Sequence, residues 1–184
     1  MMADFIYFLN AIHYCLWKAE IKFSDFIGKF VNGILSPIPK YLFTEKYRKE
    51  YYERLPNDQR EIDNLFHDKK HGYNVGWANH WFGYFYSGYS LFLSFVFGGL
   101  LLRSIDCLNI FIKLVILVIP IGLCYIPVYK AVFAKDRYLW YFKQFEKMDK
   151  QWLRKWSQIT LAFCLGSVIT TIIGIYAMFV IVLH

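Results

Sequence analysis

The sequence predicts an all-α integral membrane protein with three transmembrane helices, an amphipathic N-terminal interfacial helix and a basic helical cytoplasmic connector. Two observations carry this fold class. Hydrophobic residues make up 57% of the 184 residues and charged residues 19%, below the roughly 25% of an ordinary soluble domain. Two long stretches, 72–102 and 156–183, contain no Asp, Glu, Lys or Arg. The same composition excludes a disordered chain and a disulfide-stapled secreted mini-protein.

The three spans are predicted at about 83–102, 108–129 and 156–183, because the hydrocarbon core of a bilayer requires about 20 apolar residues per helix. The residues just before the first span are rich in Trp, Asn and His and suit the membrane interface. The second span contains Lys113, which we expect to reach the nearer surface. It also contains two prolines, Pro120 and Pro127, which we expect to kink this helix or to end it early.

The basic residues predict the orientation of the chain. Within the connector 130–155, the segment 135–155 carries seven Lys or Arg against three acidic residues, so we expect the connector to be cytoplasmic. The N-terminus is then also cytoplasmic, while the link Arg103–Cys107 and the C-terminal His184 lie outside. Small size and the lack of a targeting signal favour a bacterial inner membrane. The residues expected at the cytoplasmic interface are Trp77, Trp81, Trp140, Trp152, Trp156, Lys150, Arg154 and Lys155.

Residues 1–72 are predicted to form a cytoplasmic and interfacial helical region, followed by the transmembrane region 73–184. Apolar side chains recur at helical spacing from Phe5 to Ile34, which indicates an amphipathic helix that ends at Ser36–Pro39. We expect this helix either to lie on the inner leaflet or to pack against a partner helix. A second helix is expected to start at Pro56 and to stop at Gly72, and residues 135–155 are expected to form a helix too.

One group of polar residues has the spacing of a metal site. Asp63, His67 and His71 lie near one face of the predicted helix, and two His at i and i+4 is a spacing that binds zinc or iron. The similarity to membrane di-iron desaturases does not extend beyond this single HxxxH. Arg60 and His67 are similar in their spacing to the arginine and histidine of HEPN-type ribonucleases, although Glu61 departs from the usual pattern. We favour a solvated helix with surface histidines, and no cofactor is predicted.

Small residues form a stripe on two of the predicted spans. Because lipid provides no hydrophobic force between helices, small residues that let backbones approach closely are typical of helix contacts, within a chain or between chains. Polar Asn109 and Lys113 in the second span are candidates to line a pore in an oligomer. The predicted packing residues are Gly83, Ser87, Ser94 and Gly98 in the first span and Gly166, Thr170 and Gly174 in the third.

These patterns predict a non-enzymatic multi-pass membrane protein that acts through self-association, as a homo-oligomeric pore or a membrane-perturbing accessory subunit. The sequence contains no Walker A, HExxH or GxSxG motif, and the spans contain no Asp or Glu for a proton relay. The expected partners are the lipid bilayer and either a second copy or another protein.

Two alternative functions remain at this point. One is a membrane-tethered His- or metal-dependent hydrolase or nuclease that uses Arg60, Asp63, His67 and His71. The other is a scaffold that recruits a cytoplasmic protein or nucleic acid through residues 1–71 and 135–155. Nucleic acid is the less expected partner, because we favour anionic lipid headgroups as the explanation of the basic and aromatic connector.

Overall fold

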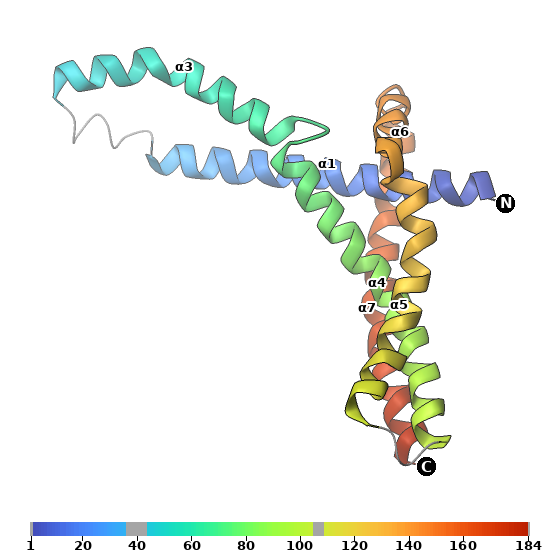
Figure 1. The fold of residues 1–184 in the computed structure, drawn as a ribbon. Coiled ribbons are helices and arrows are strands. Elements are labelled where there is room, and N and C mark those ends of the chain that lie inside the picture. Colours follow the sequence, from blue (N-terminus) through green and yellow to red (C-terminus); the bar gives the residue numbers. More distant parts are fainter. Residues whose placement is uncertain (1, 36–43, 105–108, 184) are drawn as a thin grey trace. The chain divides into compact units, whose positions relative to one another are not determined.

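The computed structural model describes residues 2–35, 44–104 and 109–183, and the regular elements in these ranges are all helices. Three helical stretches are long and apolar enough to cross a membrane, Tyr73–Leu101, Ile110–Phe145 and Lys150–Leu183, and each overlaps one of the three predicted spans over most of its length. The all-helical class with three candidate membrane spans is therefore confirmed. In chain order the elements are α1 (Met2–Leu35), α3 (Glu45–His67), α4 (Tyr73–Ser104), α5 (Ile110–Val132), the short 3-10 helix η1 (Ala134–Asp136), α6 (Arg137–Phe145) and α7 (Lys150–Leu183) (Figure 1).

The chain divides into two compact units. Unit 1 contains Met1–Cys15 and His80–His184, so that the first turns of α1 belong with the spanning helices. Unit 2 is Leu16–Asn79 and contains the rest of α1, all of α3 and the first turns of α4. The sequence-based boundary near residue 72 placed the first turns of α1 and the spanning helices in different regions. In the structure they belong to the same unit.

In unit 1, α4 and α7 run parallel to each other and make the closest helix contact in the spanning part. A Cβ added at Gly174 of α7 would lie 2.9 Å from the Phe92 Cα of α4, and one added at Gly99 would lie 3.4 Å from the Met178 Cα. Near the other end, the Thr171 hydroxyl donates a hydrogen bond to the carbonyl of Gly88 at 3.2 Å. The two backbones can approach this closely because glycine occupies the contact positions.

Helix α5 runs antiparallel to α4 and contacts it at fewer places. The Leu117 side chain lies against Gly98, and the Tyr86 hydroxyl donates to the carbonyl of Cys124 at 3.4 Å. Contrary to the expectation of an early end, α5 continues through Pro120 and Pro127 as far as Val132. Each proline removes one backbone donor, and within a membrane such a loss is tolerated when neighbouring side chains bond the freed carbonyls.

The connector consists of three pieces rather than one helix over residues 135–155. After α5 the backbone adopts the left-handed conformation at two successive residues, Lys135 (φ 57°) and Asp136 (φ 53°). This conformation costs roughly 1–2 kcal/mol per residue for side chains other than glycine, and it produces a kink between α5 and α6. A turn over residues 146–149 then separates α6 from α7. We call the end of unit 1 formed by η1, α6 and the first turns of α7 the connector end.

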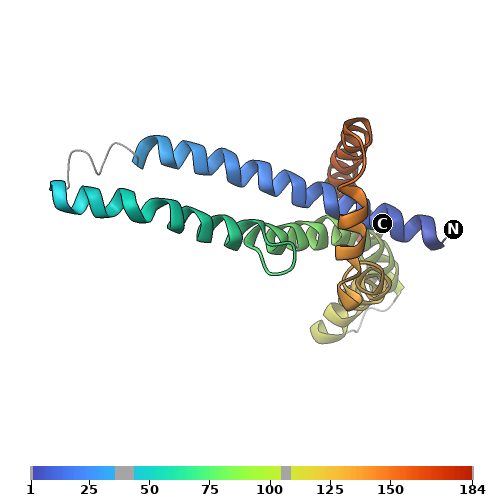
Figure 2. The same cartoon turned by 90° about the horizontal axis from the view of Figure 1, so that it is seen from above.

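In unit 2, α3 lies alongside the second part of α1 and runs in the opposite direction (Figure 2). Helix α3 begins at Glu45 and passes through Pro56, so the predicted start at Pro56 is wrong. Glu, Lys and Arg before Pro56 are strong helix formers, and their summed propensity outweighs the one hydrogen bond that the proline removes.

A tight turn joins α3 to α4. The backbone N–H groups of Lys70 and His71 donate to the Asp68 carboxylate at 3.0 and 3.3 Å, and these bonds lower the pKa of that carboxyl. Gly72 comes so close to the backbone of Asp68 that a Cβ has no room there. Gly72 therefore allows the turn, and α3 ends at His67, before the predicted stop at Gly72. The predictions for Ser36–Pro39, most of the Arg103–Cys107 link and His184 fall outside the described ranges.

We expect Gly174→Ala to destabilise the contact between α4 and α7, because the added methyl group would overlap the backbone of Phe92. Overpacking of this kind costs about 1–3 kcal/mol. The measurement is thermal unfolding of the purified protein in detergent. Gly83→Ala is the matched control, since a Cβ at Gly83 meets nothing within 4 Å. Equal unfolding temperatures for the two variants would contradict the contact.

Candidate functional site

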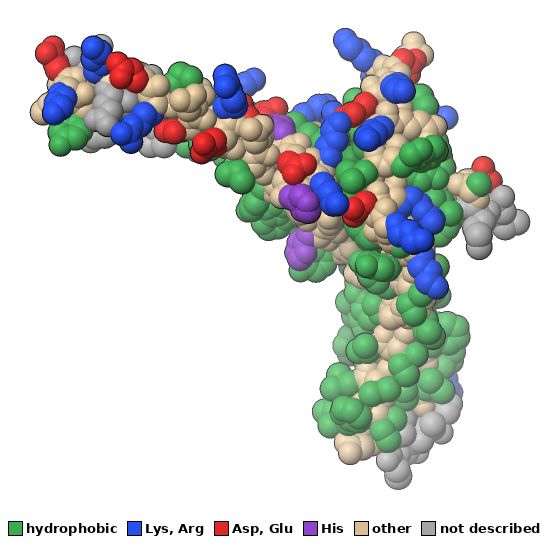
Figure 3. Space-filling view, turned by 45° about the horizontal axis from the view of Figure 1, so that its top comes forward, with side chains coloured by type: hydrophobic (Ala, Val, Ile, Leu, Met, Phe, Trp, Pro, Cys, Tyr) green, Lys and Arg blue, Asp and Glu red, His purple; other side chains and the backbone are tan. Residues whose placement is uncertain are grey.

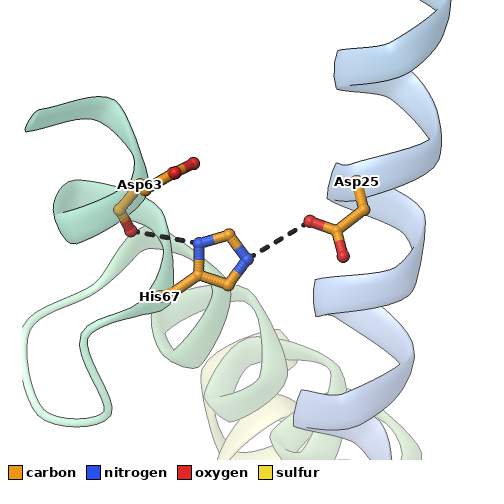
Figure 4. Close-up of polar contacts among 3 residues, drawn as sticks. All are labelled: Asp25, Asp63 and His67. Carbon is orange, nitrogen blue, oxygen red and sulfur yellow. Dashed lines mark hydrogen bonds and ion pairs between the residues drawn. The ribbon is translucent and has the colours of Figure 1, made fainter. Parts of the chain in front are cut away.

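The residues predicted as a possible metal or nuclease site all lie in unit 2, on or just after α3. His67 is held by two neighbours: its Nδ1 lies 3.0 Å from the carbonyl oxygen of Asp63 and its Nε2 lies 3.2 Å from Oδ1 of Asp25 on α1 (Figure 4). The carboxylate of Asp63 points away from the imidazole (Figure 4). His71 lies in the turn beyond the helix, where its backbone N–H bonds Asp68.

The arrangement around His67 joins two helices rather than presenting open ligands. Within the part of the chain that the structure describes, no group of three or more His, Cys, Asp or Glu side chains lies close enough to share a metal ion. Arg60 is exposed on α3, two helical turns before His67. The structure therefore does not bring Arg60, Asp63, His67 and His71 together around one point.

The predicted interface tryptophans divide into two groups. Trp77, Trp81 and Trp140 are exposed, with Trp140 the most exposed of the three. Trp152 and Trp156 are half-buried and contact Tyr7 of α1: the Trp152 indole N–H donates to the Tyr7 hydroxyl at 3.0 Å, and the rings of Tyr7 and Trp156 lie 5.6 Å apart. Lys150, Arg154 and Lys155 are exposed on the first turns of α7. Two of the five tryptophans thus hold α1 to the connector end.

The predicted packing residues also differ in their surroundings. Ser94, Gly98 and Gly174 are buried, and Gly166 lies against the Tyr89 hydroxyl. The side chains of Ser87 and Thr170 bond carbonyls of their own helices, Tyr84 and Gly166. Gly83 has open space at its Cβ position. Gly88 and Gly99, which sequence reasoning did not single out, lie directly against α7.

Sequence reasoning missed a polar and aromatic cluster at the connector end. His13 of α1 is completely buried, and the four rings of Phe82, Phe133, Tyr138 and Phe142 have centroids 5.2–5.5 Å from its own. One turn earlier, the buried Asn10 amide donates to the carbonyl of Ala131 at the end of α5, at 3.2 Å. We call these residues the connector cluster: Asn10, His13, Phe82, Ala131, Phe133, Tyr138 and Phe142.

The connector cluster holds the first turns of α1 inside unit 1. All residues from Leu9 to Cys15 are buried, so this part of α1 is enclosed on every side instead of presenting a single apolar face. The sequence carried one signal for this: Phe5 to Trp17 contains no charged residue on any face of the helix. The imidazole of His13 packs among four aromatic rings in this cluster.

Tyr14, next to this cluster, has the most strongly shifted titration outside the spans. Burial raises its pKa from 10.0 to about 12, and the negative charges of Glu146 and, when ionised, Cys15 add to the shift. The Tyr14 ring lies 5.2 Å from that of Phe142 and 5.6 Å from that of Phe145. Tyr14 therefore acts as a neutral aromatic side chain at any physiological pH.

Helix α5 presents a free apolar surface. Of its residues, those that are buried are Val128, Ala131 and Val132, all at the connector end. From Ile110 to Pro127 its side chains are exposed or half-buried, including Lys113, and a Cβ at Gly122 would meet nothing within 4 Å. Asn109 accepts a hydrogen bond from the Phe111 N–H and caps the helix. Hydrophobic side chains cover most of the visible face of the spanning helices (Figure 3).

We expect the wild-type protein to lose stability at alkaline pH as Tyr14 ionises, and Tyr14→Phe to abolish this loss. The folded pKa of about 12 exceeds the unfolded value near 10.0, so the folded state keeps this proton longer. The stabilisation is complete below pH 10 and disappears as pH rises through the folded pKa. Unfolding temperatures measured from pH 9 upward in detergent check this. Identical alkaline slopes for wild type and Tyr14→Phe would show that Tyr14 titrates normally.

Comparison of the chain with models of known protein families, with curated proteins and with solved structures finds no match.

Proposed function

We propose that this protein is a non-enzymatic membrane subunit that acts by self-association through α5, in the form of a homo-oligomeric pore. In this proposal the N-terminus and the connector end face the cytoplasm of a bacterial inner membrane and the C-terminus lies outside, as the positive-inside rule expects. The observation that supports it is that no side chain from Ile110 to Pro127 of α5 is buried, while α4 and α7 are packed against each other.

Gly122 is a second feature of α5 that supports self-association through this helix. A glycine inside a helix costs about 1 kcal/mol relative to alanine, and within this chain Gly122 provides no close contact in return. Small residues on a free helix face allow a second helix to approach closely, and such contacts hold helices together in lipid. A second copy of α5 gives this glycine a packing role.

The pore form of the proposal rests on Lys113. A Lys in an otherwise apolar span is costly where it faces hydrocarbon, and it is tolerated where it faces water or headgroups. If copies of α5 surround a central opening, Lys113 adds a ring of positive charge to it. Such a ring favours anions over cations.

We expect Gly122→Leu to shift the protein toward the monomer without unfolding it, because the larger side chain blocks close approach on α5, and a Cβ at this position meets no atom of the described residues within 4 Å. Subunit counting by single-molecule photobleaching in liposomes measures the change. Gly83→Leu, at another glycine with open space, is the control and should leave the count unchanged. A wild-type protein that is always monomeric refutes self-association.

We expect the wild-type protein in planar bilayers to conduct with a preference for anions, and Lys113→Glu to convert this to a preference for cations. The reason is the reversed sign of the charge ring along the opening. The reversal potential under a salt gradient gives the selectivity. Ion selectivity that does not respond to the charge at position 113 would exclude Lys113 from the pore, and absent conductance by an oligomer would favour a non-conducting accessory subunit.

A further inference from the structure

The second part of α1, within unit 2, carries an exposed row of large apolar side chains. Spacings of three and four residues place them on one face of the helix. Three of the six are phenylalanines with 61–65% of their surface exposed. We call this row the outer stripe of α1, and its members are Phe23, Phe26, Ile27, Phe30, Val31 and Ile34.

The neighbouring helix of unit 2 packs on the other side of α1. The contact between Asp25 and His67 joins α3 to the polar face of α1, at 3.2 Å between Oδ1 and Nε2. Ser24 and Gly28, which lie between this polar face and the stripe, are half-buried. Helix α3 is itself rich in charged residues and leaves Phe23, Phe26 and Phe30 uncovered.

The same helix shows how its apolar positions behave when a partner is present. Leu9 and Ile12 belong to the same repeating apolar pattern, and in unit 1 they are 1% and 0% exposed. The outer stripe continues this pattern beyond the point where the chain itself covers it. A contiguous row of six large apolar side chains in water marks an interaction surface.

We propose that the outer stripe of α1 binds the surface of the lipid bilayer that the chain itself spans. Unit 2 is joined to unit 1 by two uninterrupted helices, α1 at Cys15–Leu16 and α4 at Asn79–His80. The last turns of unit 2 belong to α4, whose apolar stretch Tyr73–Leu101 is long enough to span. The stripe begins eight residues after Cys15, about 12 Å along a helix.

This connection favours the bilayer over a separate protein as the occupant. The bilayer belongs to the same particle, so its contact with the stripe is intramolecular and has a high effective concentration. A second molecule would lose translational and rotational freedom on binding.

The charges beside the stripe fit a lipid surface. Between residues 22 and 34 the charged side chains are Lys22, Asp25 and Lys29. Both lysines are exposed, and Asp25 contacts His67 on α3. Phenylalanines on one face with lysines beside them are typical of helices that insert an apolar face at the headgroup boundary while their cations reach the phosphates.

Two single-cysteine variants test the proposal in the full-length chain, with the four native cysteines replaced by alanine. One carries a nitrobenzoxadiazole label at Phe30→Cys on the stripe, and its matched control carries the label at Asn32→Cys on the opposite face. In liposomes of phosphatidylcholine with a minority of phosphatidylglycerol, nitroxides on the acyl chains should quench the label at position 30 several-fold more than the label at position 32. Aqueous iodide should give the reverse order.

A second measurement needs no mutation, in case the cysteine-free chain does not fold. Hydroxyl-radical footprinting of the wild-type protein in the same liposomes should modify Phe23, Phe26 and Phe30 several-fold less than Tyr47 of α3, which is 66% exposed. Equal modification of all four residues would overturn the proposal.

Dilution of the protein with excess lipid separates the possible occupants of the stripe. Protection by lipid persists on dilution, whereas protection that disappears would assign the stripe to a second copy and overturn the proposal. The Gly122→Leu variant makes this test independent of the association through α5, since the stripe should remain protected in a monomer.

Discussion

The packing of α4 against α7 is the contact on which the membrane-spanning part of unit 1 depends. Lipid tails are as apolar as leucine, so apolar surface gives no force that brings two spanning helices together. Attraction then comes from dispersion between backbones that approach closely and from hydrogen bonds between helices. Gly88, Gly99 and Gly174 provide the close approach, and the Thr171 and Tyr89 hydroxyls bond carbonyls across the interface. Bulkier side chains at these glycines would remove the pairing.

The connector end holds the structure together by a different force. There α1 packs through Tyr7, His13 and Tyr14 against rings from α6 and α7, and aromatic edges meet faces at centroid distances of 5–6.5 Å. Outside the hydrocarbon core the burial of apolar surface stabilises the fold, and such ring pairs contribute attraction beyond that burial. The strained kink at Lys135 and Asp136 separates α5 from α6, and the packing of Tyr138 and Phe142 against His13 of α1 stabilises it.

The candidate functional surfaces are what remains after these two sets of contacts form. Helix α5 contributes only its last turn to the core, and α1 contributes its first half. The free surfaces differ in chemistry: the exposed part of α5 is suited to contact within hydrocarbon, whereas the outer stripe of α1 has lysines at its border and is suited to the headgroup region.

The sequence by itself determined the helical class and the three candidate spans, because a membrane requires long apolar helices whatever they pack against. It misplaced the start of α3, which passes through Pro56 because the rest of the helix outweighs one lost donor. Only the tertiary structure decided which residues meet. Periodicity placed Leu9 and Phe23 on one stripe, yet one is buried and the other exposed. His13 and Gly88 became contact residues through neighbours 60 or more positions away, and a local pattern carries no information about such distant partners.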